Sequence, residues 1–265
     1  MNEGPTRVRA TPAVQKWPDT VWLVRHGQSA GNVARDAAEA AGHHLIDLAT
    51  RDVDVPLSPL GERQSRALAD WFASKPAPER PSVVLASPYL RALETARIVT
   101  GVMDSPAPGV IADERLREKE FGILDRMTVA GIASAYPSLS EQRGHVGKFY
   151  FRPPGGESWC DVILRLRSVL DTMTREYSGQ RVLVVAHQVV VNCFRYLFER
   201  LTESEILALD READVPNCGV TQYEFEPAAG RHGKLVLRAA NFVAPLRAGG
   251  AAVTTAPDLP AAPKA

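Results

Sequence analysis

The sequence has few of the features that mark disulfide-rich, zinc-binding or membrane proteins. Its 265 residues include three cysteines, and Cys160, Cys193 and Cys218 form no CxxC pair, so neither a disulfide framework nor a zinc site is expected. No apolar run approaches the roughly 20 residues that cross a bilayer. The segment from Met1 to Thr20 also lacks the apolar stretch of a secretory signal. These absences predict a cytoplasmic protein with no membrane partner.

An excess of either charge is also absent. Lysine and arginine total 31, and aspartate and glutamate total 31, so the formal net charge is zero. A basic coat for binding nucleic acid is therefore not expected, whereas a local cationic pocket is compatible with this balance. The length, with 45% hydrophobic residues, is sufficient for one sizeable core.

Both ends of the chain differ in composition from its middle. Residues 1–18 are polar without periodicity, and from Pro245 onward the chain is rich in alanine, proline and glycine. Such segments cannot bury enough apolar surface to fold alone, so 1–18 and 245–265 are predicted to be disordered tails. One domain is predicted between them, over residues 19–244.

Short apolar runs in the middle of the chain alternate with helical patterns. The runs are rich in β-branched residues and do not alternate with polar ones, which is typical of strands buried on both faces of a parallel sheet. They lie at 21–24, 83–86 and 182–186. Amphipathic patterns predict helices at 58–74, 88–101, 158–177 and 187–201, and later strands are predicted at 220–225 and 234–239. This alternation favours an α/β fold.

Reactive side chains follow each of the three apolar runs. Arg25 and His26 end the first, Arg91 lies shortly after the second, and His187 directly follows the third. Because ligands of an open parallel sheet bind beyond the carboxyl ends of its strands, these side chains are expected to meet in one pocket.

Two guanidinium groups and two imidazoles suit phosphoryl chemistry. Forked guanidinium donors match the oxygens of a phosphoryl group. A neutral imidazole in line with phosphorus can attack it to form a phosphohistidine, and a second, protonated histidine adds another donor. The cations in this scheme are side chains, so no metal or cofactor is expected. The scheme still needs a carboxyl group of raised pKa to protonate the leaving alkoxide.

An ordered set of motifs supports this chemistry. The motifs are LVRHGQS at 23–29, SPYLRALETA at 87–96, LREKEFG at 116–122, PPGGES at 153–158 and VVAH at 184–187. In this order they resemble the histidine phosphatase superfamily, the phosphoglycerate mutase-like clan of phosphatases and mutases. The resemblance implies a three-layer α/β/α sandwich with a mostly parallel central sheet, and a small helical cap at about residues 120–155. It also implies a small phosphorylated substrate.

The resemblance implies a role for each matching residue. His26 is the expected nucleophile, and Glu118 matches the usual proton donor, with Glu120 as the alternative acid. The predicted catalytic residues are His26, Glu118, His187, Arg25 and Arg91. The predicted substrate-binding residues are Arg25, Asn32, Arg91, His187 and Gln188.

One competing motif supports a different chemistry. Residues 27–31, GQSAG, fit the G-x-S-x-G pattern of serine hydrolases and follow a predicted strand. This is the first strand, however, so no earlier strand and loop can supply the oxyanion donors of such an enzyme. The motif also leaves Arg25 and Arg91 unexplained, and the sequence therefore favours His26 over Ser29 as the nucleophile.

The interval between the acid and the GES motif favours a phosphatase over a mutase. Relatives of the glycolytic mutase have a long basic insertion there, whereas the interval in this chain, residues 125–155, is short. The segment ILDRMT at 123–128 also lacks the glycine that usually follows the acid loop in the family. The side chains expected to form a lid over an anionic phosphomonoester are Arg143, His145, Lys148, Tyr150 and Arg152. Two alternative functions stay open, a mutase and a catalytically idle ligand-binding relative. The oligomeric state also stays open, including a homodimer paired through the late strands.

Overall fold

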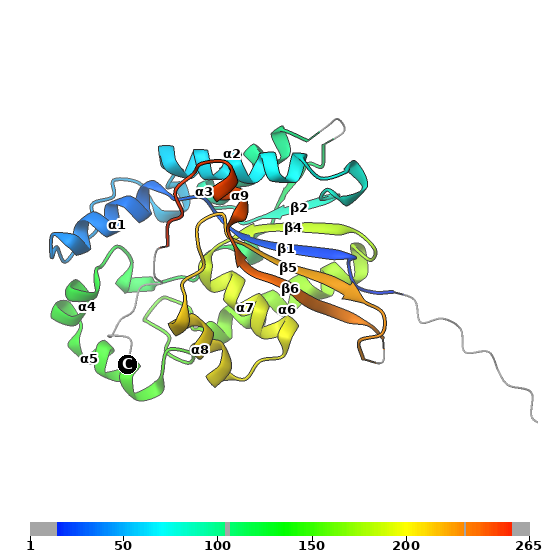
Figure 1. Cartoon of the computed structure of the whole chain (residues 1–265). Helices are drawn as coiled ribbons and strands as arrows, with labels where there is room; N and C mark the ends of the chain where they lie inside the picture. The colour runs from blue at the N-terminus through cyan, green and yellow to red at the C-terminus, as the bar shows by residue number, and fades with distance from the viewer. Residues whose placement is uncertain (1–14, 104–106, 231, 256–265) are drawn as a thin grey trace, which may run out of the picture.

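The computed structural model describes residues 15–103, 107–230 and 232–255, and within them a mixed sheet lies between two layers of helices (Figure 1). The strands are β1 (Thr20–Arg25), β2 (Val83–Ala86), β3 (Val110–Ala112), β4 (Arg181–Ala186), β5 (Val220–Glu226) and β6 (Lys234–Phe242). Their order across the sheet is β3-β2-β4-β1-β5-β6. Strands β3, β2, β4 and β1 are parallel, and β5 and β6 are antiparallel. The α/β fold with a mostly parallel sheet is confirmed.

Alternate residues of the central strands face opposite helix layers. On β1, Val21 and Leu23 belong to one buried cluster, whereas Trp22 and Val24 belong to the other. Because helices cover both faces, neither set of side chains meets water, which explains the continuous apolar runs in the sequence.

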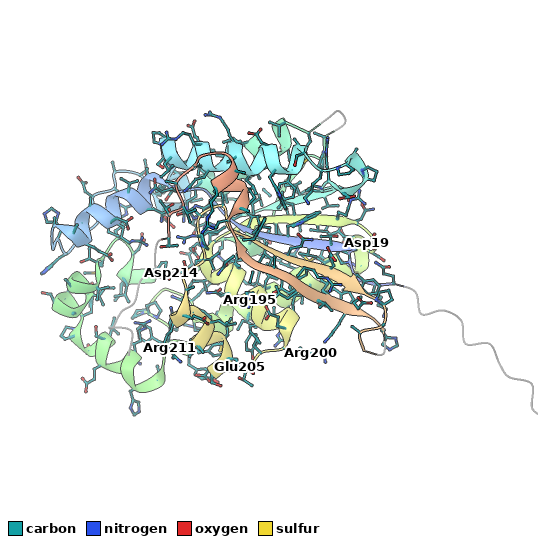
Figure 2. The ribbon with its side chains drawn as sticks, viewed as in Figure 1. Asp19, Arg195, Arg200, Glu205, Arg211 and Asp214 are labelled. Carbon is teal, nitrogen blue, oxygen red and sulfur yellow. The ribbon has the colours of Figure 1, made fainter. Side chains whose placement is uncertain are left out.

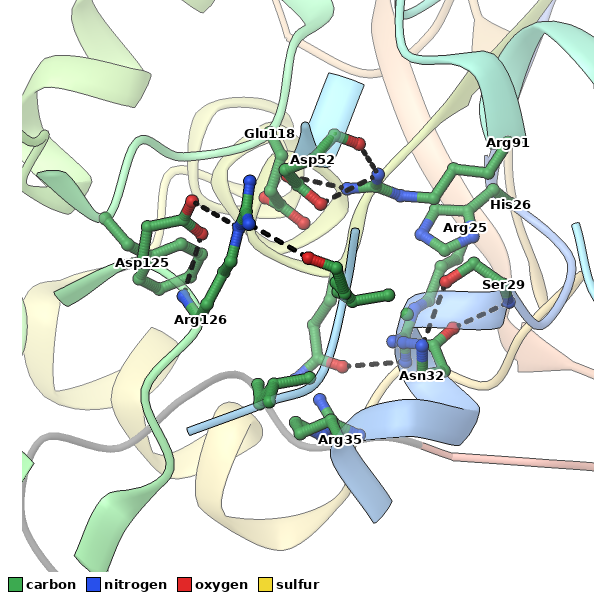
Figure 3. Close-up of a pocket in the computed structure, with 15 residues that line it drawn as sticks. Arg25, His26, Ser29, Asn32, Arg35, Asp52, Arg91, Glu118, Asp125 and Arg126 are labelled. Carbon is green, nitrogen blue, oxygen red and sulfur yellow. Dashed lines mark hydrogen bonds and ion pairs between the residues drawn. The ribbon is translucent and has the colours of Figure 1, made fainter. Parts of the chain in front are cut away.

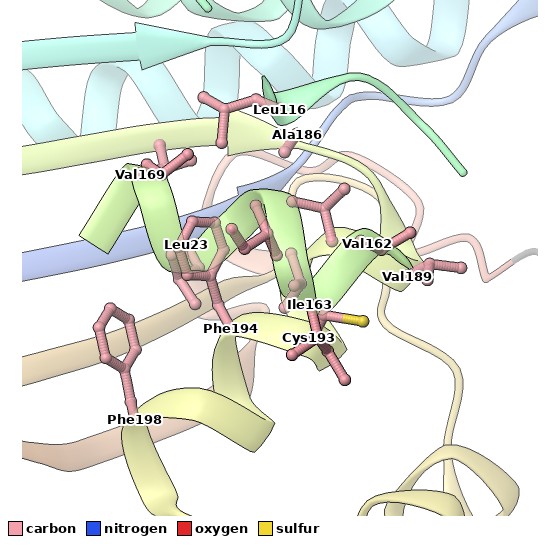
Figure 4. Close-up of a cluster of buried hydrophobic side chains, with 14 of the residues drawn as sticks. Leu23, Leu116, Val162, Ile163, Val169, Ala186, Val189, Cys193, Phe194 and Phe198 are labelled. Atoms are coloured by element: carbon pink, nitrogen blue, oxygen red, sulfur yellow. The ribbon is translucent and has the colours of Figure 1, made fainter. Parts of the chain in front are cut away.

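Two groups of helices form the outer layers. The helices on one face of the sheet are α6 (Trp159–Glu176) and α7 (Gln188–Glu199), with α8 (Glu203–Glu212) against α7. Those on the other face are α2 (Pro59–Ala73), α3 (Leu90–Gly101) and α9 (Ala244–Ala248). Figure 4 shows the first layer, where Phe194 of α7 and Val169 of α6 pack toward Leu23 of β1.

Residues 120–155 leave the sandwich between β3 and α6. They contain the short turn η4 (Gly122–Leu124), α4 (Val129–Ala135) and α5 (Pro137–Val146). Figure 1 shows α4 and α5 lying away from the sheet, on the side of α1 (Ala30–Ala40). This segment has a small core of its own, formed by Leu124, Met127, Ile132 and Phe151.

The prediction of a disordered tail from Pro245 is wrong for residues 245–255. Leu246 of α9 is fully buried in the same cluster as α2 and α3. Further on, Thr254 Oγ1 donates a hydrogen bond to Asn217 Oδ1 at 3.0 Å, and the Ala252 carbonyl accepts one from Gln64 Nε2 at 2.8 Å. One buried leucine and these polar contacts hold a segment whose composition is otherwise typical of a tail.

The other predicted tail residues fall into two groups. Residues 1–14 and 256–265 lie outside the described residues. Of the remaining N-terminal residues, Trp17 lies edge-on to Phe198 of α7, with ring centroids 6.2 Å apart. The ordered domain therefore begins before residue 19 and continues past residue 244.

We expect Leu246→Ala to lower the free energy of unfolding by about 2–5 kcal/mol, because it removes a fully buried side chain from the core. Val253→Ala, in the same segment but 40% exposed, should change it by less than about 0.5 kcal/mol. Chemical denaturation of the full chain measures both values. Equally small losses for the two variants would contradict a packed C-terminal segment.

Candidate active site

Backbone hydrogen bonds hold the carboxyl ends of β1, β4 and β2 side by side. The His26 amide donates to the Ala186 carbonyl at 2.9 Å, and the Ser87 amide donates to the Val185 carbonyl at 3.0 Å. The residues that follow these strands are therefore neighbours. The rings of His26 and His187 lie 5.1 Å apart, centroid to centroid.

A cavity of about 110 Å³ opens at these strand ends (Figure 3). Seven residues singled out from the sequence line it: Arg25, His26, Asn32, Arg91, Glu118 and Gln188, and also Ser29 of the competing serine-hydrolase motif. His187 is fully buried and contacts the ring of His26 instead of the cavity wall. The cavity is also lined by residues that sequence reasoning missed, namely Gly31, Arg35, Ile46, Leu48, Asp52, Phe121, Asp125 and Arg126.

The His26 imidazole is buried, and one hydrogen bond fixes its tautomer. Its Nδ1 lies 2.7 Å from the Gly27 carbonyl oxygen. A carbonyl can only accept, so Nδ1 carries the hydrogen and Nε2 keeps a lone pair. Burial, and next the positive charges of Arg91 and Arg25, hold the pKa of His26 well below its ordinary value. The ring is therefore a neutral imidazole near pH 7.

Glycine at position 27 lets the loop after β1 approach α2 closely. A side chain there would place its Cβ 2.5 Å from the Gly61 carbonyl oxygen. The Gly27 amide donates to Thr95 Oγ1 of α3 at 3.0 Å. The glycine of the RHG motif thus anchors the turn that carries His26.

His187 is held between a hydroxyl and a carboxylate. Its Nε2 lies 2.8 Å from Ser87 Oγ, and its Nδ1 lies 3.6 Å from Glu118 Oε2. Complete burial, followed by the charge of Arg91, lowers the pKa of His187 well below its ordinary value. Both histidines are therefore uncharged at neutral pH.

Arg25 is fixed by groups from the far end of the sequence. Its Nη1 donates to the Val215 carbonyl at 2.6 Å and to Gln188 Oε1 at 3.0 Å. Gln188 in turn donates from Nε2 to Asp214 Oδ1 at 3.0 Å. The side chain of Gln188, which the sequence analysis assigned to the substrate, here orients Arg25.

Arg91, on the first turn of α3, is paired with a carboxylate. Its Nη1 and Nη2 donate to the two carboxylate oxygens of Asp52 at 3.0 and 3.2 Å, and Nη1 also donates to the Asp52 carbonyl at 2.6 Å. The guanidinium lies 4.9 Å from the centre of the Tyr89 ring. Arg91 is thereby held rigidly at the cavity wall.

Glu118 and Glu120 occupy different surroundings. Glu118 lines the cavity and faces His187, whereas Glu120 accepts a hydrogen bond from the Tyr89 hydroxyl at 3.2 Å. The Glu118 carbonyl accepts from Arg165 Nη2 at 3.2 Å, and Arg165 is held by Glu157 of the GES motif. This framework directs Glu118 toward the cavity.

Ser29 and Asn32 cap α1. The Ser29 hydroxyl accepts from the Asn32 amide at 3.1 Å, and the Ser29 amide donates to Asn32 Oδ1 at 3.0 Å. This arrangement leaves Nδ2 as the Asn32 donor on the cavity wall. The Ser29 hydroxyl serves a helix terminus, which gives the serine-hydrolase alternative no support.

The predicted cationic lid does not cover this cavity. Lys148 lies 2.7 Å from a carboxylate oxygen of Asp210 on α8, and Arg152 pairs with Asp161 on α6. None of the five predicted lid residues lines the cavity. Carboxylates on adjacent helices neutralise the charges of Lys148 and Arg152, and this pairing was not visible in the sequence.

Neither a membrane-spanning helix nor a metal-binding cluster of side chains occurs within residues 15–103, 107–230 and 232–255. No helix there is both long and apolar enough to cross a membrane. No group of three or more His, Cys, Asp or Glu side chains there is placed to hold a metal ion.

Comparison with known families matches residues 21–235 to the histidine phosphatase superfamily (branch 1). A 2,3-bisphosphoglycerate-dependent phosphoglycerate mutase 2 of Gloeobacter violaceus is 30% identical, over 73% of this chain and 82% of that protein. A 6-phosphofructo-2-kinase/fructose-2,6-bisphosphatase of Caenorhabditis elegans is also 30% identical. That match covers 69% of this chain and 35% of that protein, so the chain spans about a third of its length.

Solved structures share the fold. Bacillus stearothermophilus YhfR aligns with a TM-score of 0.67 at 24% identity, over 86% of this chain and 98% of that chain. A mycobacterial glucosyl-3-phosphoglycerate phosphatase in complex with inorganic phosphate aligns with a TM-score of 0.65 at 23% identity, over 86% of this chain and 99% of that one.

The two buried histidines predict an acid-sensitive fold. They are neutral in the folded chain, whereas an exposed histidine protonates near pH 6.5. The unfolded chain therefore binds more protons below that pH, and stability falls as pH decreases. We expect the free energy of unfolding to drop by up to about 1.4 kcal/mol per pH unit for each histidine.

Urea denaturation at pH 7.5, 6.5 and 5.5 measures this dependence. His187→Gln should reduce the slope of the unfolding free energy against pH by about the contribution of one proton, because the fully buried imidazole is lost. A wild-type stability that is flat between pH 6.5 and 5.5 would show that the histidines are not held neutral.

Proposed function

The chain belongs to the histidine phosphatase superfamily, and from that premise we propose that it hydrolyses phosphomonoesters through a phosphohistidine on His26. One observation carries the proposal. A neutral imidazole, with its Nδ1 hydrogen donated to the Gly27 carbonyl and a lone pair on Nε2, lies at a cavity whose lining includes the guanidinium groups of Arg25 and Arg91.

Each step of the proposed reaction uses a group at this cavity. His26 Nε2 forms a bond to phosphorus as the bond from phosphorus to the leaving oxygen breaks. Arg25 and Arg91 balance the charge on the phosphoryl oxygens. Glu118 gives its proton to the leaving oxygen and then, as a carboxylate, takes one from the water that attacks the phosphohistidine. Inorganic phosphate leaves and His26 is regenerated.

The ion pairs made by two cations of the cap favour hydrolysis over transfer of the phosphoryl group to a second substrate. A mutase must retain an anionic intermediate in a water-poor pocket until a hydroxyl accepts the phosphoryl group. Lys148 and Arg152, the cap cations with ion pairs to Asp210 and Asp161, are directed away from the cavity. The mutase remains the second candidate because a relative at 30% identity carries that name.

The first test is release of inorganic phosphate from a panel of phosphomonoesters in the presence of EDTA, alongside interconversion of 3- and 2-phosphoglycerate. We expect phosphate release without interconversion, and acid-labile labelling of the protein by ³²P-substrate. His26→Ala should lower turnover by at least about 10³-fold and abolish the labelling. Undiminished turnover in that variant would remove the mechanism, and efficient interconversion would favour the mutase.

Glu118→Gln should slow alkyl phosphates by about 10²–10⁴-fold, because their leaving oxygens need a proton. The effect on p-nitrophenyl phosphate should be much smaller, since p-nitrophenolate leaves without one. Glu120→Gln is the matched control and should show no such difference between leaving groups. Equal slowing of both substrates by Glu118→Gln would contradict its role as the acid.

A further inference from the structure

The outer part of the cavity is built from two loops that pair with each other. A β-bridge joins Leu45 to Met127, and the Ile46 amide donates to the Arg126 carbonyl at 2.8 Å. The Thr128 hydroxyl adds a hydrogen bond to the His43 carbonyl at 2.7 Å. These contacts fix the loop after α1 against the loop after the acid, so the cavity has a preformed rim.

Arg126 holds an unusual backbone conformation on this rim. Its φ is 58°, in the left-handed region that favours glycine. Its Nη1 donates to the Leu48 carbonyl at 2.9 Å, and Figure 3 shows the side chain reaching inward between Asp125 and Asp52. A strained residue that directs its side chain into a pocket indicates a function for that side chain.

Carboxylates balance the guanidinium groups of the rim. Asp125 and Asp52 both line the cavity, and Asp52 lies close enough to raise the pKa of Asp125, after the larger effect of burial. On the opposite wall Arg35 is paired with Asp36 at 2.8 Å. A second phosphate or carboxylate bound at the rim would therefore meet two carboxylates as well as Arg126.

Hydroxyl groups fit this mixture of donors and acceptors. A hydroxyl can donate to a carboxylate oxygen and at the same time accept from a guanidinium N–H. The apolar part of the wall, formed by Ile46, Leu48 and Phe121, suits the C–H groups between such hydroxyls. On the basis of the proposed function, we propose that Asp52, Asp125 and Arg126 bind the hydroxyls of the leaving alcohol. The preferred substrates are then monophosphates of polyhydroxy alcohols such as sugars, without a second anionic group.

Matched substrates test this specificity in the full-length protein. The kcat/KM for glycerol 3-phosphate should exceed that for 3-phosphoglycerate and for propyl phosphate by at least about tenfold. The reason is that 3-phosphoglycerate has an added negative charge and propyl phosphate lacks the hydroxyls. Fructose 6-phosphate should likewise exceed fructose 1,6-bisphosphate. Equal or better use of the charged partner in both pairs would overturn the proposal.

Arg126→Gly should lower the ratio of kcat/KM for glycerol 3-phosphate over propyl phosphate by about tenfold or more. Arg200→Gly is its matched control, since Arg200 also has a left-handed φ, of 56°, and is exposed at the C-terminal end of α7 (Figure 2). Both variants relieve the same backbone strain and should shift Tm in the same direction. Only Arg126→Gly should change the substrate ratio, and an equal ratio in the two variants would contradict the role of Arg126.

Asp125→Asn gives an independent readout, because it removes one rim charge without changing the backbone. It should raise kcat/KM for 3-phosphoglycerate relative to glycerol 3-phosphate.

If propyl phosphate and p-nitrophenyl phosphate are hydrolysed through the phosphohistidine but hydroxyls bring no advantage, the rim proposal fails and the proposed function stands. If no phosphomonoester is hydrolysed, both fail.

Discussion

Two neutral imidazoles buried beside two guanidinium groups form the constraint on which the rest of this structure depends. Burial disfavours protonation of His26 and His187, and the charges of Arg91 and Arg25 add to that effect. Buried guanidinium groups are themselves costly unless they are hydrogen-bonded. Each therefore has fixed partners: the Val215 carbonyl and Gln188 for Arg25, and Asp52 for Arg91.

The same constraint explains why distant segments converge on the end of β1. The Arg25 carbonyl accepts a hydrogen bond from the Cys218 amide at 2.9 Å, and the His26 carbonyl accepts one from Asn217 Nδ2 at 3.0 Å. Asn217 is held in turn by Thr254, beyond α9. The C-terminal segment, which composition alone suggested was a tail, thus supports the turn that carries the nucleophile.

The parts of the site that lie next to regular elements could be predicted from the sequence. Arg25 ends β1, and His26 and His187 directly follow β1 and β4. The parallel register brings these strand ends together whatever the intervening loops do. The helix at 158–177 was equally clear, because Ser158 and Asp161 form its capping box.

The rim and the cap could not be predicted in this way, because both depend on pairings between segments without periodicity. Nothing local to Asp52 indicates that it meets Arg91, 39 positions later in the chain. The charges of residues 143–152 were visible, but the carboxylates of Asp161 and Asp210 that bind Arg152 and Lys148 lie on other elements.

The left-handed conformation alone does not make Arg126 functional, since Arg200 has nearly the same φ on the protein surface. An L-residue there costs about 1–2 kcal/mol relative to the right-handed form, and a helix end readily imposes that cost. Arg200 ends α7 in this way, whereas Arg126 belongs to a loop paired with another loop. Its backbone carbonyl and its guanidinium both bond to the segment 46–48, so the conformation and the direction of the side chain are set together. A glycine would keep the backbone bond and lose the charge between Asp52 and Asp125, and that charge is what the strained residue adds to the cavity.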